Sequence, residues 1–383
     1  MHVLSSVAAY AYAAAWQIIP FLFVLTIVVF FHELGHFLIA RRCGVAVKVF
    51  SIGFGKEIVG WTDRKGTRWR LSVIPLGGFV RFLGDENEAG MPDRQALESL
   101  KPEERELAFA SKRVGQRAAI VAAGPIANFI LAIAIYSGIF AFYGREVISA
   151  RADVIVANTP AERAGFKPGD LIVAINGRHV DSFNDMQRIV SVATGQPLNI
   201  DVMRDGHLVS LTATPERRTI PDGFGSKQTA GVLGIQRNTK GSDITVERFT
   251  PLQAVGMAFS ESWFVAERTV GYLFGVVAGR ESADQLGGPI RVAEVAAQVA
   301  TLGFVALINL AALLSISIGL INLFPVPILD GGHLLFFAFE ALRGRPLSEQ
   351  VQEIGFRIGF VAIVALMLFV TGNDLGIWHH FAG

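Results

Sequence analysis

The chain has 383 residues, of which 51% are hydrophobic and only 17% are charged. Because soluble domains usually carry about 25% charged residues, this composition argues against a purely soluble protein. The 34 basic and 33 acidic side chains nearly cancel, so the net charge creates no field that would attract nucleic acid. Cys43 is the single cysteine, which excludes an internal disulfide and a metal site built from several cysteines.

Four apolar stretches are long enough, or nearly so, to cross a membrane as a helix, which takes about 20 residues. The sequence predicts spanning helices at about 16–40, 118–143, 301–329 and 354–373. The third lies within an uncharged stretch, 295–329, where we expect an approach segment and a break at Pro325 and Pro327. A cleaved signal peptide is the alternative for the first stretch, but no Lys or Arg precedes its apolar run. The predicted fold class is a polytopic α-helical membrane protein with four transmembrane helices.

Lysine and arginine residues set the expected orientation, because short cytoplasmic connections retain them. The connection between the first two spans holds fifteen of them, within 41–117. The short third connection adds Arg343 and Arg345, whereas residues 1–15 and 372–383 hold none. Both termini are therefore predicted to lie outside the cytoplasm and these two connections inside it.

Three segments outside the spans have recognisable patterns. The inner connection at about 45–85 is rich in glycine and β-favouring runs, which predicts a hairpin or small sheet. In the outer connection, residues 148–235 alternate β-branched runs with turn signals, which predicts a small β-rich domain. Apolar residues recur every three or four positions in 251–280, which indicates an amphipathic helix. That helix either packs on its own domain or lies on the membrane surface.

The first predicted span carries the sequence His32-Glu33-Leu34-Gly35-His36. Positions four apart share one side of a helix, so both imidazoles can bind one metal ion while Glu33 stands beside them. Ionisable residues within an apolar span are costly and usually mark function. A catalytic zinc normally has three protein ligands, and 118–143 contains no Asp, Glu or His. Asp330 after the third apolar stretch is the expected third ligand, with His333 as the alternative.

Asparagines within the apolar spans have two expected uses. Asn322 lies eight residues before Asp330, in a segment that two prolines keep from being regular helix. We expect its amide to bond a substrate backbone, with an interhelical hydrogen bond as the alternative. Asn128 and Asn309 are expected to hold helices together, with a role in the site as the alternative.

Three motifs together resemble the site-2 protease family of intramembrane zinc metalloproteases. They are His32-Glu33-Leu34-Gly35-His36, Gly124-Pro125-Ile126-Ala127-Asn128-Phe129, and the segment 322–332, which reads NLFPVPILDGG. The similarity covers almost the whole chain and points to the bacterial regulator of sigma-E proteases within the family. The outer domain, 148–235, resembles a bacterial PDZ domain, with the turn Lys167-Pro168-Gly169-Asp170 occurring once.

The resemblance implies residue roles. It implies that His32, His36 and Asp330 bind Zn²⁺, and that Glu33 is the catalytic acid and base. It also implies that Asn322 contacts the substrate near the scissile bond. These roles describe an intramembrane zinc metalloendopeptidase.

Substrates and location are implied in the same way. Gly77 and Gly78 would belong to a membrane-associated β-loop that presents its edge to unwound substrate. The implied substrates are single-pass transmembrane proteins, such as anti-sigma factors or signal-peptide remnants, cut in regulated intramembrane proteolysis. The implied location is the bacterial inner membrane, with periplasmic termini, a periplasmic PDZ domain and an active site toward the cytoplasmic half. Membrane lipid is an expected partner and nucleic acid is not.

Two other functions stay open from the residues alone. A membrane-anchored peptidase would use the same metal site on soluble peptides, with the PDZ-like domain as a docking module. A transporter or assembly scaffold would use intramembrane His and Asp side chains as a proton relay, and inverted helix repeats would support it. The PDZ-like domain itself either captures a peptide or only excludes bulky substrates.

Overall fold

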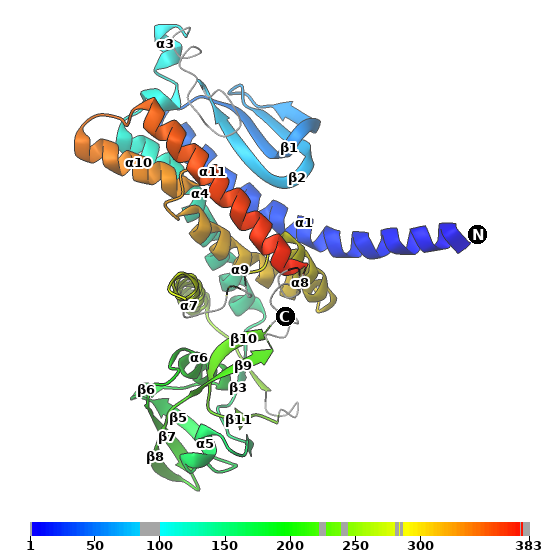
Figure 1. Ribbon diagram of the computed structural model, residues 1–383, viewed down its shortest axis with the longest axis vertical. Coiled ribbons are helices and arrows are strands. Elements are labelled where there is room, and N and C mark those ends of the chain that lie inside the picture. The colour runs from blue at the N-terminus through cyan, green and yellow to red at the C-terminus, as the bar shows by residue number, and fades with distance from the viewer. Residues whose placement is uncertain are drawn as a thin grey trace. The chain divides into compact units, whose positions relative to one another are not determined.

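The structure is a computed structural model that describes residues 2–84, 100–221, 227–238, 244–279, 283, 286–375 and 377. The chain forms two compact units. Unit 1 comprises residues 1–139, 254–280 and 286–383, and unit 2 comprises residues 140–253 and 281–285. Figure 1 shows that long helices dominate unit 1, whereas strands and short helices build unit 2.

Among the described residues, four helices of unit 1 are long and apolar enough to cross a membrane, as the sequence predicts. They are α1 (His2–Arg42), α4 (Val114–Phe142), α9 (Phe304–Asn322) and α11 (Glu349–Asp374). A helix satisfies its backbone N–H and C=O groups internally, which lipid requires. The candidate spans within them are 18–42, 114–142, 304–322 and 350–374.

Small residues bring α4 close to both α1 and α9. A Cβ atom added to Gly35 of α1 would lie 2.2 Å from the carbonyl oxygen of Ala123 on α4. On α9, a Cβ atom added to Gly319 would lie 3.2 Å from the Cβ atom of Asn128. Such glycines let membrane helices pack almost backbone to backbone. The helix that carries His32 and His36 is thereby set directly against α4.

An antiparallel hairpin of β1 (Val47–Thr62) and β2 (Arg68–Phe82) packs against α1, where the sequence indicates β-structure. The rings of Phe50 and Trp69 stack with centroids 4.3 Å apart, and both rings contact Phe37 of α1. At the hairpin turn, Asp63 forms an ion pair with Arg41 in the last turn of α1. Aromatic packing and this ion pair therefore hold the hairpin on the helix that carries the histidines.

The third apolar stretch contains three elements. The approach segment is α8 (Pro289–Thr301), the helix that follows is α9, and residues 323–329 form an irregular turn. The helix ends at Asn322 and not at 329, because Pro325 disfavours helical backbone at Phe324 and cannot donate a backbone hydrogen bond. Asp330 then begins a new helix, α10 (Asp330–Arg343). The carboxylate is therefore presented by a helix start, which the sequence pattern did not indicate.

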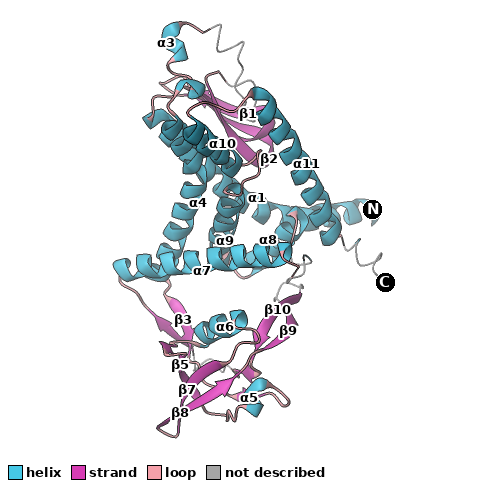
Figure 2. Ribbon diagram, turned by 60° about the vertical axis from the view of Figure 1, so that its left-hand side comes forward, coloured by secondary structure: helices cyan, strands magenta, loops and turns pink. Residues whose placement is uncertain are grey.

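The described part of unit 1 also holds α3 (Pro102–Arg105), the 3₁₀ turn η1 (Phe109–Ser111) and most of α7 (Pro251–Val277). In Figure 2, α7 runs across the direction of α4 and α9. Its small residues, such as Ala254 and Ala258, are buried. Its large apolar side chains are exposed, namely Leu252, Val255, Phe259, Trp263, Phe274 and Val277. The helix therefore has one face of large apolar side chains, as its sequence pattern predicts.

Unit 2 is a small mixed domain whose main sheet has the order β6-β5-β7-β8. These strands are β5 (Leu171–Ile175), β6 (Arg178–His179), β7 (Leu198–Arg204) and β8 (His207–Ala213), with the helices α5 (Pro160–Arg163) and α6 (Phe183–Val192). Unit 2 also contains the antiparallel strand pairs β3–β12, β4–β11 and β9–β10. These strands are β3 (Arg145–Ile148), β4 (Val154–Ile155), β9 (Glu216–Pro221), β10 (Lys227–Val232), β11 (Ile235–Gln236) and β12 (Ile244–Glu247). Ile172, Ile200 and Val202 lie at the centre of the core of unit 2.

Candidate metal centre

Helical spacing on α1 brings two imidazoles together. The Nε2 atoms of His32 and His36 lie 3.2 Å apart, and each residue is only 9% exposed. The Nδ1 atom of His36 lies 2.9 Å from the carbonyl oxygen of Ile120 on α4. That carbonyl can only accept, so Nδ1 carries the proton and the Nε2 lone pair of His36 is free for a metal.

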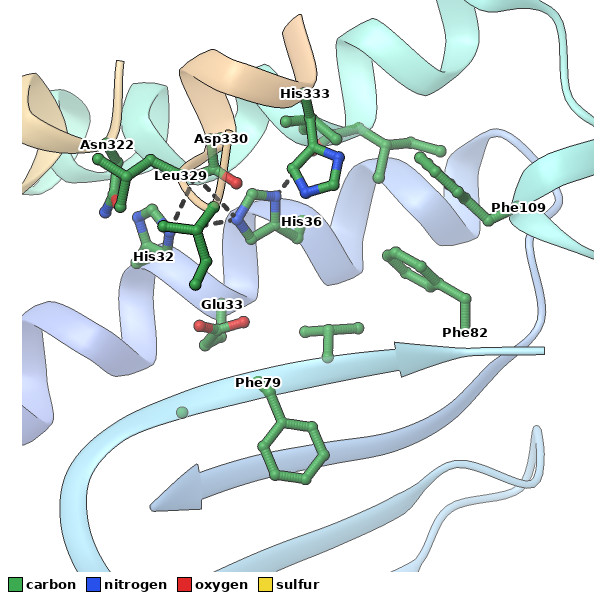
Figure 3. A pocket seen from close by; sticks show the side chains of 15 residues that line it. His32, Glu33, His36, Phe79, Phe82, Phe109, Asn322, Leu329, Asp330 and His333 are labelled. Atoms are coloured by element: carbon green, nitrogen blue, oxygen red, sulfur yellow. Dashed lines mark hydrogen bonds and ion pairs between the residues drawn. The ribbon is translucent and has the colours of Figure 1, made fainter. Parts of the chain in front are cut away.

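Asp330 joins the two imidazoles from the first position of α10. Its Oδ2 atom lies 3.2 Å from Nε2 of His32 and 3.5 Å from Nε2 of His36. Figure 3 shows this convergence, with dashed lines linking Asp330 to both rings. The three donor atoms all lie within 4.8 Å of one another. Two nitrogens and one carboxylate oxygen are a ligand set that suits zinc in a catalytic site.

A carboxylate oxygen within this cluster lacks a conventional partner. Oδ2 of Asp330 is buried, and among the described residues its close contacts are with the two Nε2 atoms, with no conventional hydrogen bond. A buried carboxylate oxygen that faces the Nε2 lone pair of His36 is costly, and a cation held between it and the two imidazoles would satisfy it. The donors therefore fit a zinc ion chemically as well as geometrically.

A cavity of about 260 Å³ opens beside the three donors. It is large enough for several water molecules. The chemistry-bearing residues that line it are His32, Glu33, His36, Asn322, Asp330 and His333. The hairpin contributes Gly78, Phe79, Val80 and Phe82 to the same wall. One space is therefore shared by the metal donors, a carboxylate, an amide and a strand of the hairpin.

Glu33 stands on the side of the imidazoles that faces the hairpin (Figure 3). A Cβ atom added to Gly78 would lie 3.1 Å from Cγ of Glu33 and 2.7 Å from the carbonyl oxygen of Ser51. Gly78 thus lets β2 approach the carboxylate closely. Gly77 does not line the cavity; its φ of +121° and the nearby Phe54 ring account for a glycine there. The sequence does not distinguish these two glycines, but the structure does.

Asn322 precedes the turn 323–329 that leads to Asp330, and His333 follows that turn on α10. Asn322 is the last residue of α9 and is half-buried at the cavity. Among the described residues, no side-chain hydrogen bond of Asn322 is found, so the interhelical alternative has no support. His333 contacts the rings of Phe356 and Phe337, with centroids 5.3 and 6.5 Å away. It lines the cavity but is not among the three clustered donors.

Two residues of α4, Asn128 and Gly124, lie against the imidazoles of the metal centre, which the sequence did not indicate. Asn128 is fully buried, and its Nδ2 atom lies 3.3 Å from Nδ1 of His32. Asn309, which the same pattern places in an apolar span, is exposed. Gly124 makes room for both imidazoles, because an added Cβ atom would lie 2.2 Å from Nε2 of His36 and 2.9 Å from Cε1 of His32. Asn128 and Gly124 reach the imidazoles because α4 packs against α1, and the sequence does not show which helices pack together.

Residues 20–366 match peptidase family M50, which is most of the chain. The chain belongs to this family, the site-2 proteases. A protein of Rhizobium meliloti that is named as a zinc metalloprotease is 46% identical over 360 residues, covering 94% of this chain and 96% of the relative. The metalloprotease MmpA of Caulobacter vibrioides is 40% identical over 387 residues, covering 95% and 96%.

This M50 peptidase is a membrane-bound metalloprotease that uses zinc, as the family and its relatives do. Members of the site-2 protease family act on membrane proteins. The donor cluster on α1 and α10 lies within the matched residues.

Proposed function

We propose that this M50 peptidase hydrolyses peptide bonds inside the transmembrane segments of single-pass membrane proteins, in regulated intramembrane proteolysis. The observation that carries the proposal is the place of the donor cluster. His32 and His36 lie well inside an apolar span that begins at Ile18, and their nitrogens converge with Asp330 on a cavity. A site at such depth suits a substrate that is itself in the membrane.

In this proposal His32, His36 and Asp330 hold the zinc ion, and Glu33 is the catalytic acid and base. A zinc ion held by these three residues would supply a Lewis acid for the scissile carbonyl and would lower the pKa of water at the site to about 7. Glu33 takes the proton from the attacking water as the new C–O bond forms. It then gives that proton to the amide nitrogen as the C–N bond breaks, so a carboxylic acid and an amine are released, and the acid passes its remaining proton to the amine or to solvent.

Access to a peptide bond requires local unwinding, because a helix in lipid hides its carbonyls in internal hydrogen bonds. Asn322 offers a donor and an acceptor at the cavity. The hairpin segment with Gly77 and Gly78 would add strand-like bonds to the extended substrate. We assign all three residues to substrate binding.

The proposed topology places the protein in a bacterial inner membrane with both termini in the periplasm and the active site toward the cytoplasmic half. The Lys and Arg residues within 41–117 support it. We propose domain limits of 1–143 and 295–383 for the two membrane halves, with the hairpin at about 45–85. We assign 251–280, which contains α7, to the periplasmic surface of the inner membrane, since the large apolar side chains of α7 are exposed.

We assign residues 148–235 to a PDZ-like domain that screens substrates by size. Its PDZ-like turn is anchored by Asp170, which pairs with Arg204 through two contacts of 2.7 Å. Residues 222–226 of this range lie outside the described part of the chain. Anti-sigma factors or signal-peptide remnants, both trimmed outside the membrane, are the substrate type that such a screen would admit.

Cleavage of a panel of single-span substrates by the purified protein and its Glu33→Gln variant tests the proposal. The wild type should cut within the apolar segment, and Glu33→Gln should lose cleavage but keep its zinc, because Glu33 is not a ligand. Soluble peptides with the same sequence but no membrane anchor serve as the control. Faster cleavage of those peptides would instead identify a membrane-anchored peptidase for soluble substrates.

A further inference from the structure

Asn128 is placed as a partner of a metal donor, beyond its role in helix packing. It lies on α4, its side chain is fully buried, and its amide faces Nδ1 of His32 at 3.3 Å. The other amide atom, Oδ1, is buried and has no hydrogen-bond partner among the described residues. A buried amide oxygen left without a partner costs free energy, so this arrangement calls for an explanation.

Helix packing does not explain the side chain. The hydrogen bond that links α4 to α9 at this level runs from Oγ of Ser315 to the backbone carbonyl of Asn128, at 2.9 Å. Any residue at position 128 would supply that carbonyl. The close approach of Gly319 to the Cβ atom of Asn128 also needs no amide. The amide itself therefore contacts His32 of α1 and adds no hydrogen bond to α9 among the described residues.

The imidazole of His32 needs a hydrogen-bond acceptor beside its Nδ1 atom if its Nε2 atom is to bind a metal. Its Nε2 atom points at Asp330 and His36, with contacts of 3.2 Å to each. A neutral imidazole that offers Nε2 to a metal carries its proton on Nδ1, and that N–H needs an acceptor. His36 meets the same requirement with the backbone carbonyl of Ile120. His32 has Asn128 in the corresponding place.

We propose that Asn128 is a positioning residue for His32, through its amide oxygen. A half-turn of the amide about its Cβ–Cγ bond exchanges Nδ2 and Oδ1, which have nearly the same shape. Oδ1 then accepts the Nδ1–H of His32, while Nδ2 takes the position where Oδ1 has no partner among the described residues. This bond keeps the Nε2 lone pair free and holds the ring toward the other two donors. The inference rests on the proposed ligand set of His32, His36 and Asp330.

The test is the zinc dissociation constant of the purified full-length protein, measured by competition with a chelator in detergent. Loss of a hydrogen-bond partner behind a metal-binding histidine typically weakens metal affinity about 10–100-fold. Asn128→Leu keeps the size of the side chain and removes the acceptor, so a loss in this range is expected. Asn128→Asp keeps an acceptor and should stay within about threefold of the wild type.

Two controls separate positioning from packing and from the proposed site. Ser315→Ala removes the α4–α9 hydrogen bond without touching His32, and should leave zinc affinity unchanged. Thermal unfolding of the zinc-free proteins shows whether each variant folds like the wild type. If Asn128→Leu does not fold, Asn128→Asp still decides the matter, because loss of zinc binding by that variant overturns the inference.

The remaining outcomes are also decisive. Wild-type affinity in Asn128→Leu, or an equal loss in Ser315→Ala, overturns the positioning role while leaving the ligand set intact. His32→Ala serves as the reference, with zinc binding expected to be lost. If His32→Ala keeps its zinc, the proposed ligand set is wrong, which is a different failure from that of Asn128.

Discussion

Arg117 at the start of α4 forms an ion pair with Glu340 on α10, with Nη2 and Oε1 2.6 Å apart. The two side chains are only 15% and 13% exposed, and the guanidinium also lies 5.0 Å from the ring centroid of Phe337. Because α10 begins with Asp330, this pair helps to fix the helix that brings the carboxylate to the two imidazoles. It joins α4 and α10, two elements that both contact the metal centre.

Breaking this pair should weaken the metal centre as well as the fold. In Glu340→Gln the free energy of unfolding should fall by about 1–3 kcal/mol, because a largely buried guanidinium loses its charged partner. Zinc affinity should fall too. Reversing the pair with Arg117→Glu and Glu340→Arg together should restore part of both. Glu353→Gln is the matched control, since its pair with Arg357 is exposed, and should cost no more than about 0.5 kcal/mol.

Gly124→Ala should abolish zinc binding. The added Cβ atom would lie 2.2 Å from Nε2 of His36 and 2.5 Å from its Cε1 atom, so the imidazole must leave the ligand position. Gly138→Ala on the same helix has no atom within 4 Å of the added Cβ, and should keep full zinc content by elemental analysis. Zinc retained in Gly124→Ala would mean that the metal lies elsewhere.

Asn322→Leu should slow cleavage of a stable apolar helix much more than cleavage of a helix already weakened by Gly or Pro. The bonds that the amide offers exist only when the substrate is extended, so they favour the reactive geometry. Cleavage rates for a matched pair of substrates measure the difference, and zinc content should stay unchanged. Equal slowing of both substrates would remove the unwinding role.

Unit 2 should lose stability in acid below about pH 4. Burial alone raises the pKa of Asp170, but hydrogen bonds from Arg204 and from the backbone N–H of Lys167 outweigh it and hold the pKa below the ordinary 3.8. A carboxyl with a lowered pKa stabilises the folded state above about pH 4, and that contribution fades as pH falls through the lower, folded-state pKa.

Hydrogen exchange of β5 and β7 measures this effect in the full chain. Asp170→Asn should exchange faster than the wild type at pH 6, and the difference should shrink as the pH drops below 4. A difference that stays constant down to pH 3 would contradict an ionised Asp170 as the source of the stability.

The exposed apolar face of α7 should lie in lipid. In a protein whose only tryptophan is Trp263, made by replacing the other four of its five tryptophans with Phe, lipids with brominated chains should quench its fluorescence. Trp263 is 65% exposed in the structure, so direct contact with lipid is available to it. Vesicles without bromine are the control. Fluorescence that brominated lipids leave unchanged would place this face in water or against protein.

The spacing of residues along a helix and the scarcity of charged residues made the spans and the candidate metal ligands predictable from the sequence. Apolar runs of the right length indicate spans because lipid leaves the backbone no other partner than its own helix. Four-residue spacing puts His32 and His36 on one side of α1 because an α-helix has 3.6 residues per turn. Asp330 could be predicted as the third metal ligand because carboxylates are rare near apolar stretches, so few other residues are candidates for that role.

Only the tertiary structure separated residues that look alike in the chain. Asn128 and Asn309 both sit in apolar helices, yet Asn128 contacts His32 and Asn309 is exposed. Gly78 lines the cavity and Gly77 does not. These differences depend on which helix faces meet and at what height, which local periodicity does not encode. They arise from contacts between residues far apart in the sequence, such as positions 32 and 128, whose geometry is set by packing.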